Sequence, residues 1–307
     1  MTPDQSPLAI DRQDTFLGRE IGRLSYGCWR LPGAPQAEVA AKIDAALEIG
    51  ANLIDTAAVY GFGGDGFGAA EAMLGKLIAE RQSLRDDIVL VTKGGITPPL
   101  PYNSSAEHLI ASCEASLQRL NCDHVDLFLV HRPDNLTGHA AVAEALGELV
   151  RSGKARAVGV SNYTLEQTRA LQHFLDEPIV ATQPEISAWC TETLFNGVLD
   201  HAQSASMLPM AWSPLAGGSL ATGIAPGGSP DRFPDLIAVI DRIAGDNNST
   251  RDCVALAWLL AHPAGIVPIL GTQSPERIRA AAGAFDINMN RRDWYDILEA
   301  SLGERMP

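Results

Sequence analysis

The fold class that this sequence predicts is α/β, and within that class a single-domain (β/α)8 TIM barrel. The chain has 307 residues, and about 250 residues is typical of such a barrel. Eight short runs rich in β-branched residues alternate with amphipathic stretches, which is the pattern of repeated βα units. Two of these runs, Ile88–Lys93 and Val125–His131, are almost continuously apolar, as strands buried on both faces should be. An open doubly wound sheet is the alternative arrangement of the same units.

Eight strands are expected, each followed by a helix. The strands are Leu24–Cys28, Asn52–Asp55, Ile88–Lys93, Val125–His131, Ala155–Ser161, Ile179–Pro184, Met207–Ser213 and Ile266–Leu270. The helices begin near Gln36, Ala69, Ala106, Gly138, Leu165, Thr191, Arg251 and Pro275. No linker divides this series, so residues 1–307 are expected to form one domain.

Local signals mark the ends of several of these helices. The segments Ser104–Glu107 and Thr164–Gln167 have the spacing of a capping box. Pro275 follows Ser274 and would occupy a first helical position, where proline is favoured. Gly50 stands where a left-handed residue is expected after the first helix.

Three segments lie outside the eight units. Residues 1–23 (Met1–Arg23) form an N-terminal lead, and residues 291–302 (Arg291–Leu302) have the pattern of an extra amphipathic helix. Residues 216–234 (Ala216–Pro234) are rich in glycine and proline. We expect them to form a mobile loop over one mouth of the barrel, in contact with cofactor or substrate.

The composition indicates a globular protein with an acidic surface. Hydrophobic residues make up 46% and charged residues 20%, and 37 acidic against 23 basic residues give a formal net charge of −14. Such a surface repels phosphate backbones and anionic lipid, so neither nucleic acid nor a membrane is an expected partner. Five scattered cysteines indicate reduced thiols. Because no apolar run reaches about 20 residues and the start lacks a secretory pattern, we expect a cytoplasmic protein.

Four residues that can do chemistry stand at or near the ends of three successive strands. Asp55 ends the second predicted strand, Lys93 the third and His131 the fourth, while Tyr60 follows Asp55 by five residues. Active sites of (β/α)8 barrels lie at the carboxyl ends of the strands. The four side chains are therefore expected to converge on one rim. Any one of them alone would more often be a cap or a solvated residue.

Together these groups suit the reduction of a carbonyl. Negative charge develops on the carbonyl oxygen during hydride transfer, and a proton donor is needed there. A phenol has an ordinary pKa near about 10, and the Lys93 ammonium is expected to lower the pKa of Tyr60 by favouring the phenolate. Asp55 would be the counter-ion of a buried Lys93. His131 would hydrogen-bond the substrate oxygen and orient it.

Four motifs in order along the chain resemble those of the aldo-keto reductases. They are Asp-Thr-Ala-x-x-Tyr-Gly from Asp55, Val-Thr-Lys ending at Lys93, Val-His-Arg-Pro-Asp around His131, and Gly-Val-Ser-Asn ending at Asn162. The resemblance covers roughly Leu17 to Leu302 and is closest to a bacterial-type branch. It implies a hydride-transferring oxidoreductase with Tyr60 as the acid, Lys93 and Asp55 as its tuning pair and His131 as the orienting group. Trp29, Tyr60 and His131 are the expected substrate contacts.

The resemblance also implies a nicotinamide cofactor, NADP(H) rather than NAD(H). Gln183 and the pair Ser161 and Asn162 would hydrogen-bond the carboxamide, and Trp212 would stack on the ring where tyrosine is more usual. The backbone expected along the diphosphate is that of Ser213, Pro214, Leu215, Ala216, Gly217 and Gly218. The expected contacts at the adenosine side are Gly271, Thr272, Gln273 and Arg277. Arg277 would bind the 2′-phosphate, although Gly271 replaces a lysine that many members carry.

The segment Gly61–Gly66 matches a G-x-G-x-x-G dinucleotide pattern. That pattern has meaning only directly after a strand and within a βαβ unit. Here it begins beyond Tyr60, several residues after the strand that ends at Asp55. We therefore expect a flexible loop beside the substrate mouth.

Two other function classes remain open from the sequence alone. One is a cofactor-binding regulatory subunit of the channel-associated β type, without significant turnover, and the other is a metal-dependent barrel hydrolase. The metal-binding patterns H-E-x-x-H and C-x-x-C are absent from the sequence, so no metal site is expected. The remaining histidines are expected to be solvated: His108, His124, His139, His173, His201 and His262. Aldehydes, sugars, steroids and ketones all stay open as small-molecule substrates, as do the direction of the reaction and the oligomeric state.

Overall fold

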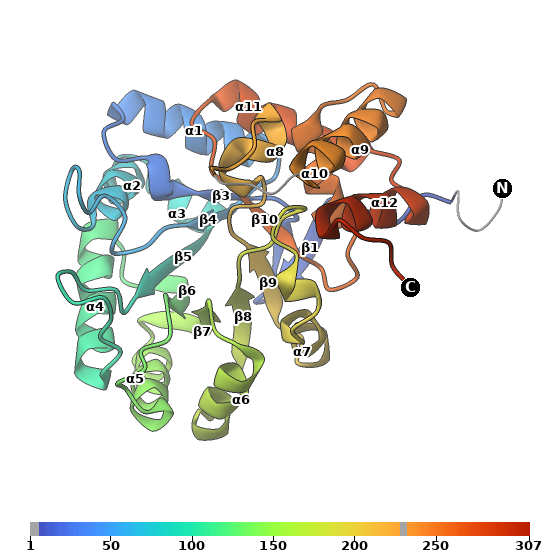
Figure 1. Cartoon of the computed structure of the whole chain (residues 1–307). Helices are drawn as coiled ribbons and strands as arrows, with labels where there is room; N and C mark the ends of the chain where they lie inside the picture. Colours follow the sequence, from blue (N-terminus) through green and yellow to red (C-terminus); the bar gives the residue numbers. More distant parts are fainter. Residues whose placement is uncertain (1–5, 228–231) are drawn as a thin grey trace.

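The computed structural model describes residues 6–227 and 232–307 and contains the predicted closed barrel (Figure 1). Eight strands pair in parallel with their sequence neighbours, and the last pairs with the first. They are β3 (Ser25–Gly27), β4 (Leu53–Asp55), β5 (Val89–Gly94), β6 (Val125–Val130), β7 (Ala155–Ser161), β8 (Ile179–Gln183), β9 (Leu208–Ala211) and β10 (Val267–Leu270). Each overlaps a predicted strand. Because the sheet is closed, the alternative of an open doubly wound sheet is excluded.

A ring of helices surrounds the barrel, one after each strand. These helices are α1 (Gln36–Glu48), α2 (Ala69–Glu80), α4 (Ala106–Leu120), α5 (His139–Arg151), α6 (Leu165–Phe174), α7 (Val198–Ser204), α10 (Arg251–Leu260) and α11 (Pro275–Ala280). Further helices are α3 (Ser83–Asp87), α8 (Ser219–Thr222), α9 (Arg232–Asp246) and α12 (Arg291–Leu302). The extra C-terminal helix is confirmed with the predicted bounds.

One helix start was predicted wrongly. The helix expected near Thr191 begins instead at Val198, after a 3-10 turn at Glu192–Leu194. Gly197 precedes α7 with φ of 80°, a left-handed conformation that interrupts the helical path between the two segments.

The segment 216–234 is not a continuous loop. Residues Ala216–Gly218 form a 3-10 turn that leads into α8, and Arg232–Pro234 belong to the first turn of α9. Pro234 is compatible with this first turn, because the missing N–H has no helical partner there. Residues 228–231 of the predicted loop, like residues 1–5 of the predicted lead, lie outside the described part of the chain.

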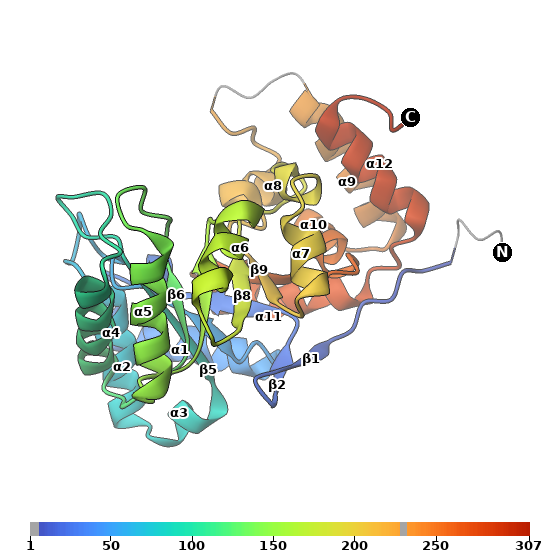
Figure 2. The same ribbon diagram turned by 90° about the horizontal axis from the view of Figure 1, so that it is seen from below.

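The core has two layers. One cluster fills the inside of the barrel, and a second, larger one lies between the strands and the helix ring. The predicted lead contains a hairpin, β1 (Gln13–Phe16) and β2 (Arg19–Gly22), whose Phe16 and Ile21 belong to the inner cluster. The hairpin therefore closes the barrel from one end, and Figure 2 shows it on the side opposite to α8.

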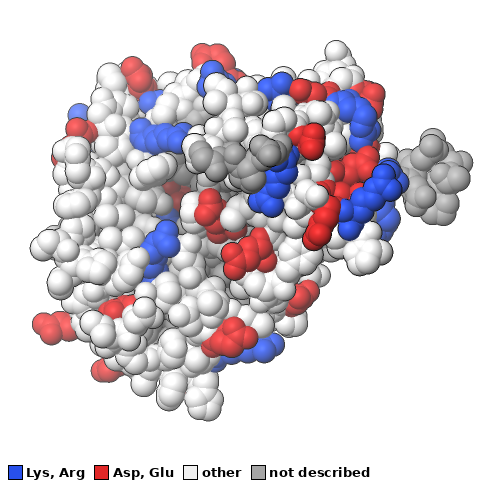
Figure 3. Space-filling view, in the orientation of Figure 1, with Lys and Arg blue, Asp and Glu red and all other residues white. Residues whose placement is uncertain are grey.

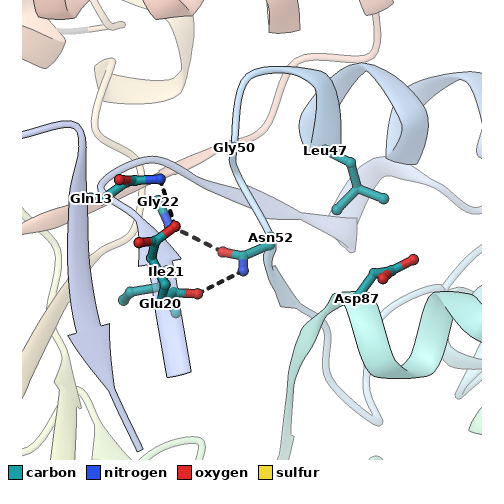
Figure 4. Close-up of a pocket in the computed structure, with 8 residues that line it drawn as sticks. All are labelled: Gln13, Glu20, Ile21, Gly22, Leu47, Gly50, Asn52 and Asp87. Atoms are coloured by element: carbon teal, nitrogen blue, oxygen red, sulfur yellow. Dashed lines mark hydrogen bonds between the residues drawn. The ribbon is translucent and has the colours of Figure 1, made fainter. Parts of the chain in front are cut away.

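The hairpin also frames a pocket at this amino-terminal end (Figure 4). Asn52 bridges its two sides, because its Nδ2 donates to the Glu20 carbonyl (3.0 Å) and its Oδ1 accepts from the Gly22 N–H (3.1 Å). The pocket is lined by Gln13, Glu20, Ile21, Gly22, Leu47, Gly50, Asn52 and Asp87. It lies at the opposite end of the strands from the residues predicted to do chemistry.

α12 packs against α9 and is fixed to α10 by a pair of tryptophans. The rings of Trp258 and Trp294 stack with centroids 5.1 Å apart. Each indole N–H donates to the backbone carbonyl of the other residue at 3.0 Å. The extra helix is thus part of the folded domain.

The predicted capping signals differ in outcome. Thr164 forms the full capping box with Gln167, and Ser274 caps α11. Gly50 has the expected positive φ, 79°. The capping box at Ser104 was wrong, because the N-cap is Ser105, whose side chain makes no capping hydrogen bond.

Candidate active site

The alternation of strand residues gathers the predicted polar residues at the carboxyl end of the barrel. Successive side chains of a strand point to opposite faces. Leu53, Val91, Leu129, Ala181 and Met210 belong to the inner cluster. Two residues further along each chain segment come, in the same order, Asp55, Lys93, His131, Gln183 and Trp212. The same inward face therefore ends in a layer of polar and aromatic groups.

Lys93 is at the centre of this layer and is fully buried. Its ammonium donates three hydrogen bonds: to Asp55 Oδ2 (2.7 Å), to the Thr56 carbonyl (2.9 Å) and to the Tyr60 hydroxyl (3.0 Å). All three of its N–H donors are thereby used. Because the Tyr60 oxygen accepts from Lys93, its own O–H proton is left to donate elsewhere.

Burial and neighbouring charges shift the pKa values of Tyr60 and Lys93 in opposite directions. Burial raises the pKa of Tyr60 above its ordinary value, and this outweighs the Lys93 ammonium, which acts to lower it. The expectation of a lowered phenol pKa is thus wrong, because desolvation is the larger effect. Burial acts to lower the pKa of Lys93, but Asp55 and Tyr60 together raise it. Lys93 is therefore a stable cation.

His131 lies beside Tyr60, with the two rings edge to face and 5.9 Å between centroids. Burial, together with the positive charges of Lys93 and Arg132, holds the pKa of His131 well below its usual range. The imidazole is therefore neutral at physiological pH. A neutral imidazole can donate one hydrogen bond to a substrate oxygen without being the source of the transferred proton.

A second hydrogen-bond network joins this centre to the residues expected at the nicotinamide. Gln183 Nε2 donates to Asp55 Oδ1 (2.8 Å). Asn162 Nδ2 donates to the His131 carbonyl (3.1 Å), and Trp212 Nε1 donates to Asn162 Oδ1 (3.0 Å). The Ser161 hydroxyl donates to the Gln183 carbonyl (2.9 Å). The residues predicted at the nicotinamide thus form one hydrogen-bonded layer with the predicted catalytic residues, because Asn162 Nδ2 also donates to Ser161 Oγ (2.9 Å).

The segment predicted to lie along a diphosphate follows Trp212 directly. Ser213 and Ala216 have positive φ, 53° and 50°, which is uncommon outside glycine. Gly217 and Gly218 also have positive φ, and the Gly217 N–H donates to Ser213 Oγ (3.0 Å). A Cβ added at either glycine would meet nothing within 4 Å. Pro214 is buried and Leu215 is partly buried, whereas Gly217 is exposed.

The segment after β10 carries the residues predicted at the adenosine side. Gly271 is exposed and a Cβ there would meet nothing within 4 Å. Thr272 Oγ1 accepts from the Ser274 N–H (3.4 Å), and Gln273 Nε2 donates to the buried Tyr26 hydroxyl (3.4 Å). Arg277 is exposed, and its guanidinium has no hydrogen-bond or ion-pair partner in the part of the chain that the structure describes. It is therefore free to bind a ligand.

Trp29 lies at the rim and is 63% exposed. It borders a shallow depression together with Arg30, Pro32 and Gly61–Asp65. The segment Gly61–Gly66 consists of turns before α2, as the loop interpretation predicted, and does not follow a strand directly.

The profile of the Aldo/keto reductase family matches residues 23–301. The chain belongs to this family. It is an oxidoreductase that acts on carbonyl groups. Aldo-keto reductases generally use nicotinamide cofactors.

Named relatives cover almost the whole chain. A 6-dehydroglucose reductase of Novosphingobium aromaticivorans is 46% identical, with 96% of this chain and 97% of the relative aligned. A second 6-dehydroglucose reductase, from Agrobacterium fabrum, is 41% identical over 94% of this chain and 96% of its own. The crystal structure of a thermostable aldo-keto reductase bound to the inhibitor epalrestat matches with a TM-score of 0.80 and 26% identity. That match covers 94% of this chain and 99% of the crystallised one.

The surface of this aldo-keto reductase carries both signs of charge around the hollow of the face shown in Figure 3. No cluster of three or more metal-ligating side chains occurs in residues 6–227 and 232–307. Within the same ranges no helix is both long and apolar enough to cross a membrane. All five cysteines are free thiols.

Sequence reasoning missed three charged residues near the site and misjudged several histidines. Arg132 and Glu185 are partly buried beyond the ends of β6 and β8, and Glu71 is fully buried in α2. Their positions directly beside His131 and after Gln183 could have indicated the first two. Three histidines are not solvated as expected. His124 Nε2 and His139 Nδ1 are buried. His262 is half-buried, and its Nδ1 accepts from the Ala264 N–H (3.2 Å).

Proposed function

We propose that this aldo-keto reductase reduces the aldehyde group of an oxidised sugar with NADPH, and that Tyr60 is the proton donor. The observation that carries the proposal is the hydrogen-bonded chain from Asp55 through Lys93 to Tyr60, with distances of 2.7 and 3.0 Å. It presents one free phenolic proton at the mouth of a barrel. The family supports reduction of a carbonyl, and the two 6-dehydroglucose reductases support an oxidised sugar as the substrate class.

Each residue of the chain would have a distinct part in the reduction. Tyr60 transfers its proton to the carbonyl oxygen as negative charge develops there. The Lys93 ammonium, held by Asp55, stabilises the phenolate that remains. Neutral His131 donates a hydrogen bond to the same oxygen and so fixes the carbonyl relative to Tyr60.

The residues opposite this centre fit a nicotinamide cofactor. When bound, the reduced cofactor would supply the hydride that reaches the carbonyl carbon. Trp212, whose orientation is fixed by Asn162, would provide the stacking surface. The open backbone at Gly217 and Gly218 would accommodate the diphosphate. The free guanidinium of Arg277 would bind a 2′-phosphate, which supports NADPH over NADH.

Two charged side chains at the mouth support a polar, hydroxyl-rich substrate. Arg132 directly follows His131, and Glu185 lies two residues after Gln183. Both side chains are partly buried and have no hydrogen-bond partner in residues 6–227 and 232–307. Burial raises the pKa of Glu185, and Arg132 acts against this rise. Partly buried polar groups are stabilised by hydrogen bonds, and sugar hydroxyls can accept from the guanidinium and donate to the carboxylate.

The proposal is tested by following NADPH oxidation with 6-dehydroglucose, glyceraldehyde and benzaldehyde. We expect the highest kcat/KM with 6-dehydroglucose, and glucose as the product. Arg132→Met and Glu185→Gln should raise KM for the sugar and leave KM for benzaldehyde unchanged. Cofactor binding without turnover of any carbonyl would instead support the regulatory-subunit function.

A further inference from the structure

A buried charged cluster lies outside the site, between α2 and the barrel. The carboxylate of Glu71, in the first turn of α2, is completely shielded from solvent. Its Oε1 accepts a hydrogen bond from the Thr92 hydroxyl, and its Oε2 accepts from Arg119 Nε at 2.7 Å. Arg119 also donates to Ser116 Oγ (3.1 Å). We call these four residues the Glu71 cluster.

The Glu71 cluster is connected to both members of the Tyr60–Lys93 contact. Thr92 precedes Lys93 in β5, and strand alternation directs Thr92 toward the helix layer while Lys93 faces the barrel interior. On the other side, Ala70 precedes Glu71, and its N–H donates to the Tyr60 carbonyl (3.3 Å). Glu71 is therefore linked to both residues of the contact. Its carboxylate binds Thr92, the neighbour of Lys93, and its own neighbour Ala70 binds the backbone of Tyr60.

Arg119 fixes the end of the loop that follows Tyr60. A Cβ added at Gly68, where φ is 83°, would lie 2.4 Å from Arg119 Cδ, so this glycine packs directly on the arginine. The guanidinium carbon is 5.7 Å from the centre of the Phe67 ring. The loop thus ends on the same guanidinium that pairs with Glu71.

We propose that Glu71 is a positioning residue for carbonyl reduction, holding Tyr60 and Lys93 in register through Thr92 and the start of α2. This role rests on the proposed function of Tyr60 and Lys93. Glu71 is fully buried between α2, α4 and β5, although the Arg119 side chain is 24% exposed. The pair resists displacement, because breaking it leaves the buried carboxylate uncompensated. The position of these two side chains matters for the rate, since a misplacement of about 1 Å can cost roughly 10²-fold in rate.

The most selective variant is Thr92→Val, which keeps shape and removes only the hydroxyl that anchors β5 to Glu71. We expect kcat of the folded enzyme to fall by about 10-fold, within the range of geometric effects. The KM values for sugar and NADPH should stay within about twofold, because Thr92 contacts neither site. Thr92→Ser, which restores the hydroxyl, should restore kcat. Should Thr92→Val not fold, Glu71→Gln is measured in the same way.

The chain offers a matched control at the other end of the barrel. Asp126 is likewise a buried carboxylate, bound by Arg85 (2.8 Å) and by the Leu90 N–H (2.8 Å). Arg85→Met should lower the melting temperature and leave kcat unchanged. A purely structural role of the Glu71 cluster predicts the same outcome for Thr92→Val, and that outcome would overturn the proposal.

A double variant separates this proposal from the proposed function itself. If Thr92 acts through Tyr60, Thr92→Val should have almost no further effect on kcat in a Tyr60→Phe background. An equal fold-loss in both backgrounds would show that Glu71 acts elsewhere. High turnover by Tyr60→Phe alone would instead refute the assignment of the proton donor, whatever Thr92→Val does.

Discussion

Gln183 Nε2 donates a hydrogen bond to Asp55 Oδ1 at 2.8 Å, while Lys93 occupies the other carboxylate oxygen at 2.7 Å. The residue expected to bind the nicotinamide carboxamide is therefore in direct contact with the counter-ion of Lys93. Both oxygens of Asp55 are used, so this buried carboxylate is fixed from two sides of the barrel. If Gln183 binds the nicotinamide and Tyr60 donates the proton as proposed, the two sites are connected through this one carboxylate.

The first prediction concerns the proton donor. Tyr60→Phe removes the hydroxyl that the Lys93 ammonium contacts and should reduce kcat by about 10²-fold or more, as general acid catalysis usually contributes. NADPH affinity should be unchanged, because Tyr60 is absent from the expected cofactor contacts. Steady-state kinetics and cofactor titration measure the two effects. A near wild-type rate would exclude Tyr60 as the acid.

The second prediction separates the structural and catalytic parts of Lys93. Lys93→Met leaves the Asp55 carboxylate buried without its cation, which should cost about 3–5 kcal/mol of unfolding free energy and most of the activity. In the double variant Lys93→Met with Asp55→Asn the buried charge is gone, so stability should recover while activity does not. Urea unfolding and turnover are measured on the wild type and on both variants. Equal stability of the single and double variants would contradict the buried ion pair as described.

The third prediction concerns the stacking residue. Trp212→Ala should weaken NADPH binding by about 1 kcal/mol or more, the scale of an aromatic stack. Trp212→Phe should lose less, because it keeps a flat face and removes only the hydrogen bond to Asn162. NADPH should quench tryptophan fluorescence in the wild type and in the control Trp294→Phe, whose ring packs on α10. Identical cofactor titrations for wild type and Trp212→Ala would remove Trp212 from the site.

The fourth prediction concerns stability in acid. Burial lowers the pKa of His262, and its Nδ1 is needed as an acceptor for the Ala264 N–H. Below the ordinary histidine pKa of about 6.5, the unfolded chain binds a proton that the folded chain resists. Neutral His262 therefore contributes to the unfolding free energy above about pH 6.5. This contribution is lost as the pH falls through the pKa that His262 has in the folded protein.

The variant His262→Asn tests this contribution. Its side-chain oxygen can accept the same N–H, as asparagine does in Asx turns, but it does not titrate. Between pH 7.5 and pH 5 the unfolding free energy of His262→Asn should fall less than that of the wild type. Parallel pH profiles would mean that His262 does not contribute.

The sequence predicted the strand-end residues because two short-range rules place them. Period-2 alternation carries the inward face of each strand to its last residue, and the carboxyl ends of parallel strands share one rim. Asp55, Lys93 and His131 could be located in this way without knowledge of their partners, whereas Gln183 was expected only from the resemblance to the aldo-keto reductases. The burial of these residues and the raised pKa of Tyr60 could not be predicted without the fold, because desolvation depends on every neighbouring element.

The residues that sequence reasoning missed depend on long-range partners. Glu71 resembles an ordinary acidic residue in a first helical turn, and its partner Arg119 lies 48 positions away. α9 was overlooked because Pro234 was interpreted as the end of a loop rather than as a first-turn residue. For Glu71 the deciding contact lies between elements that the chain brings together only on folding, whereas α9 was missed because of a local signal.

The last prediction concerns cofactor preference, and two arginines on one helix provide the comparison. Arg279 forms an ion pair with Glu48, with contacts of 2.5 and 3.1 Å, whereas the Arg277 guanidinium has no partner among the described residues. A paired guanidinium is already committed, and a free one can bind a 2′-phosphate through charge-assisted hydrogen bonds. With Gly271 offering no lysine, Arg277 must supply most of the discrimination.

A hydrogen bond to a charged group is worth about 1.5–3 kcal/mol, which corresponds to roughly 10- to 150-fold in affinity. Arg277→Ala should therefore raise KM for NADPH by at least about 10-fold and leave KM for NADH almost unchanged. Arg279→Ala should change neither value, although it removes the ion pair with Glu48. Equal losses with both cofactors would show that Arg277 does not recognise the phosphate. A selective loss in Arg279→Ala would assign that role to the other arginine, because only the residue that contacts the phosphate can distinguish the two cofactors.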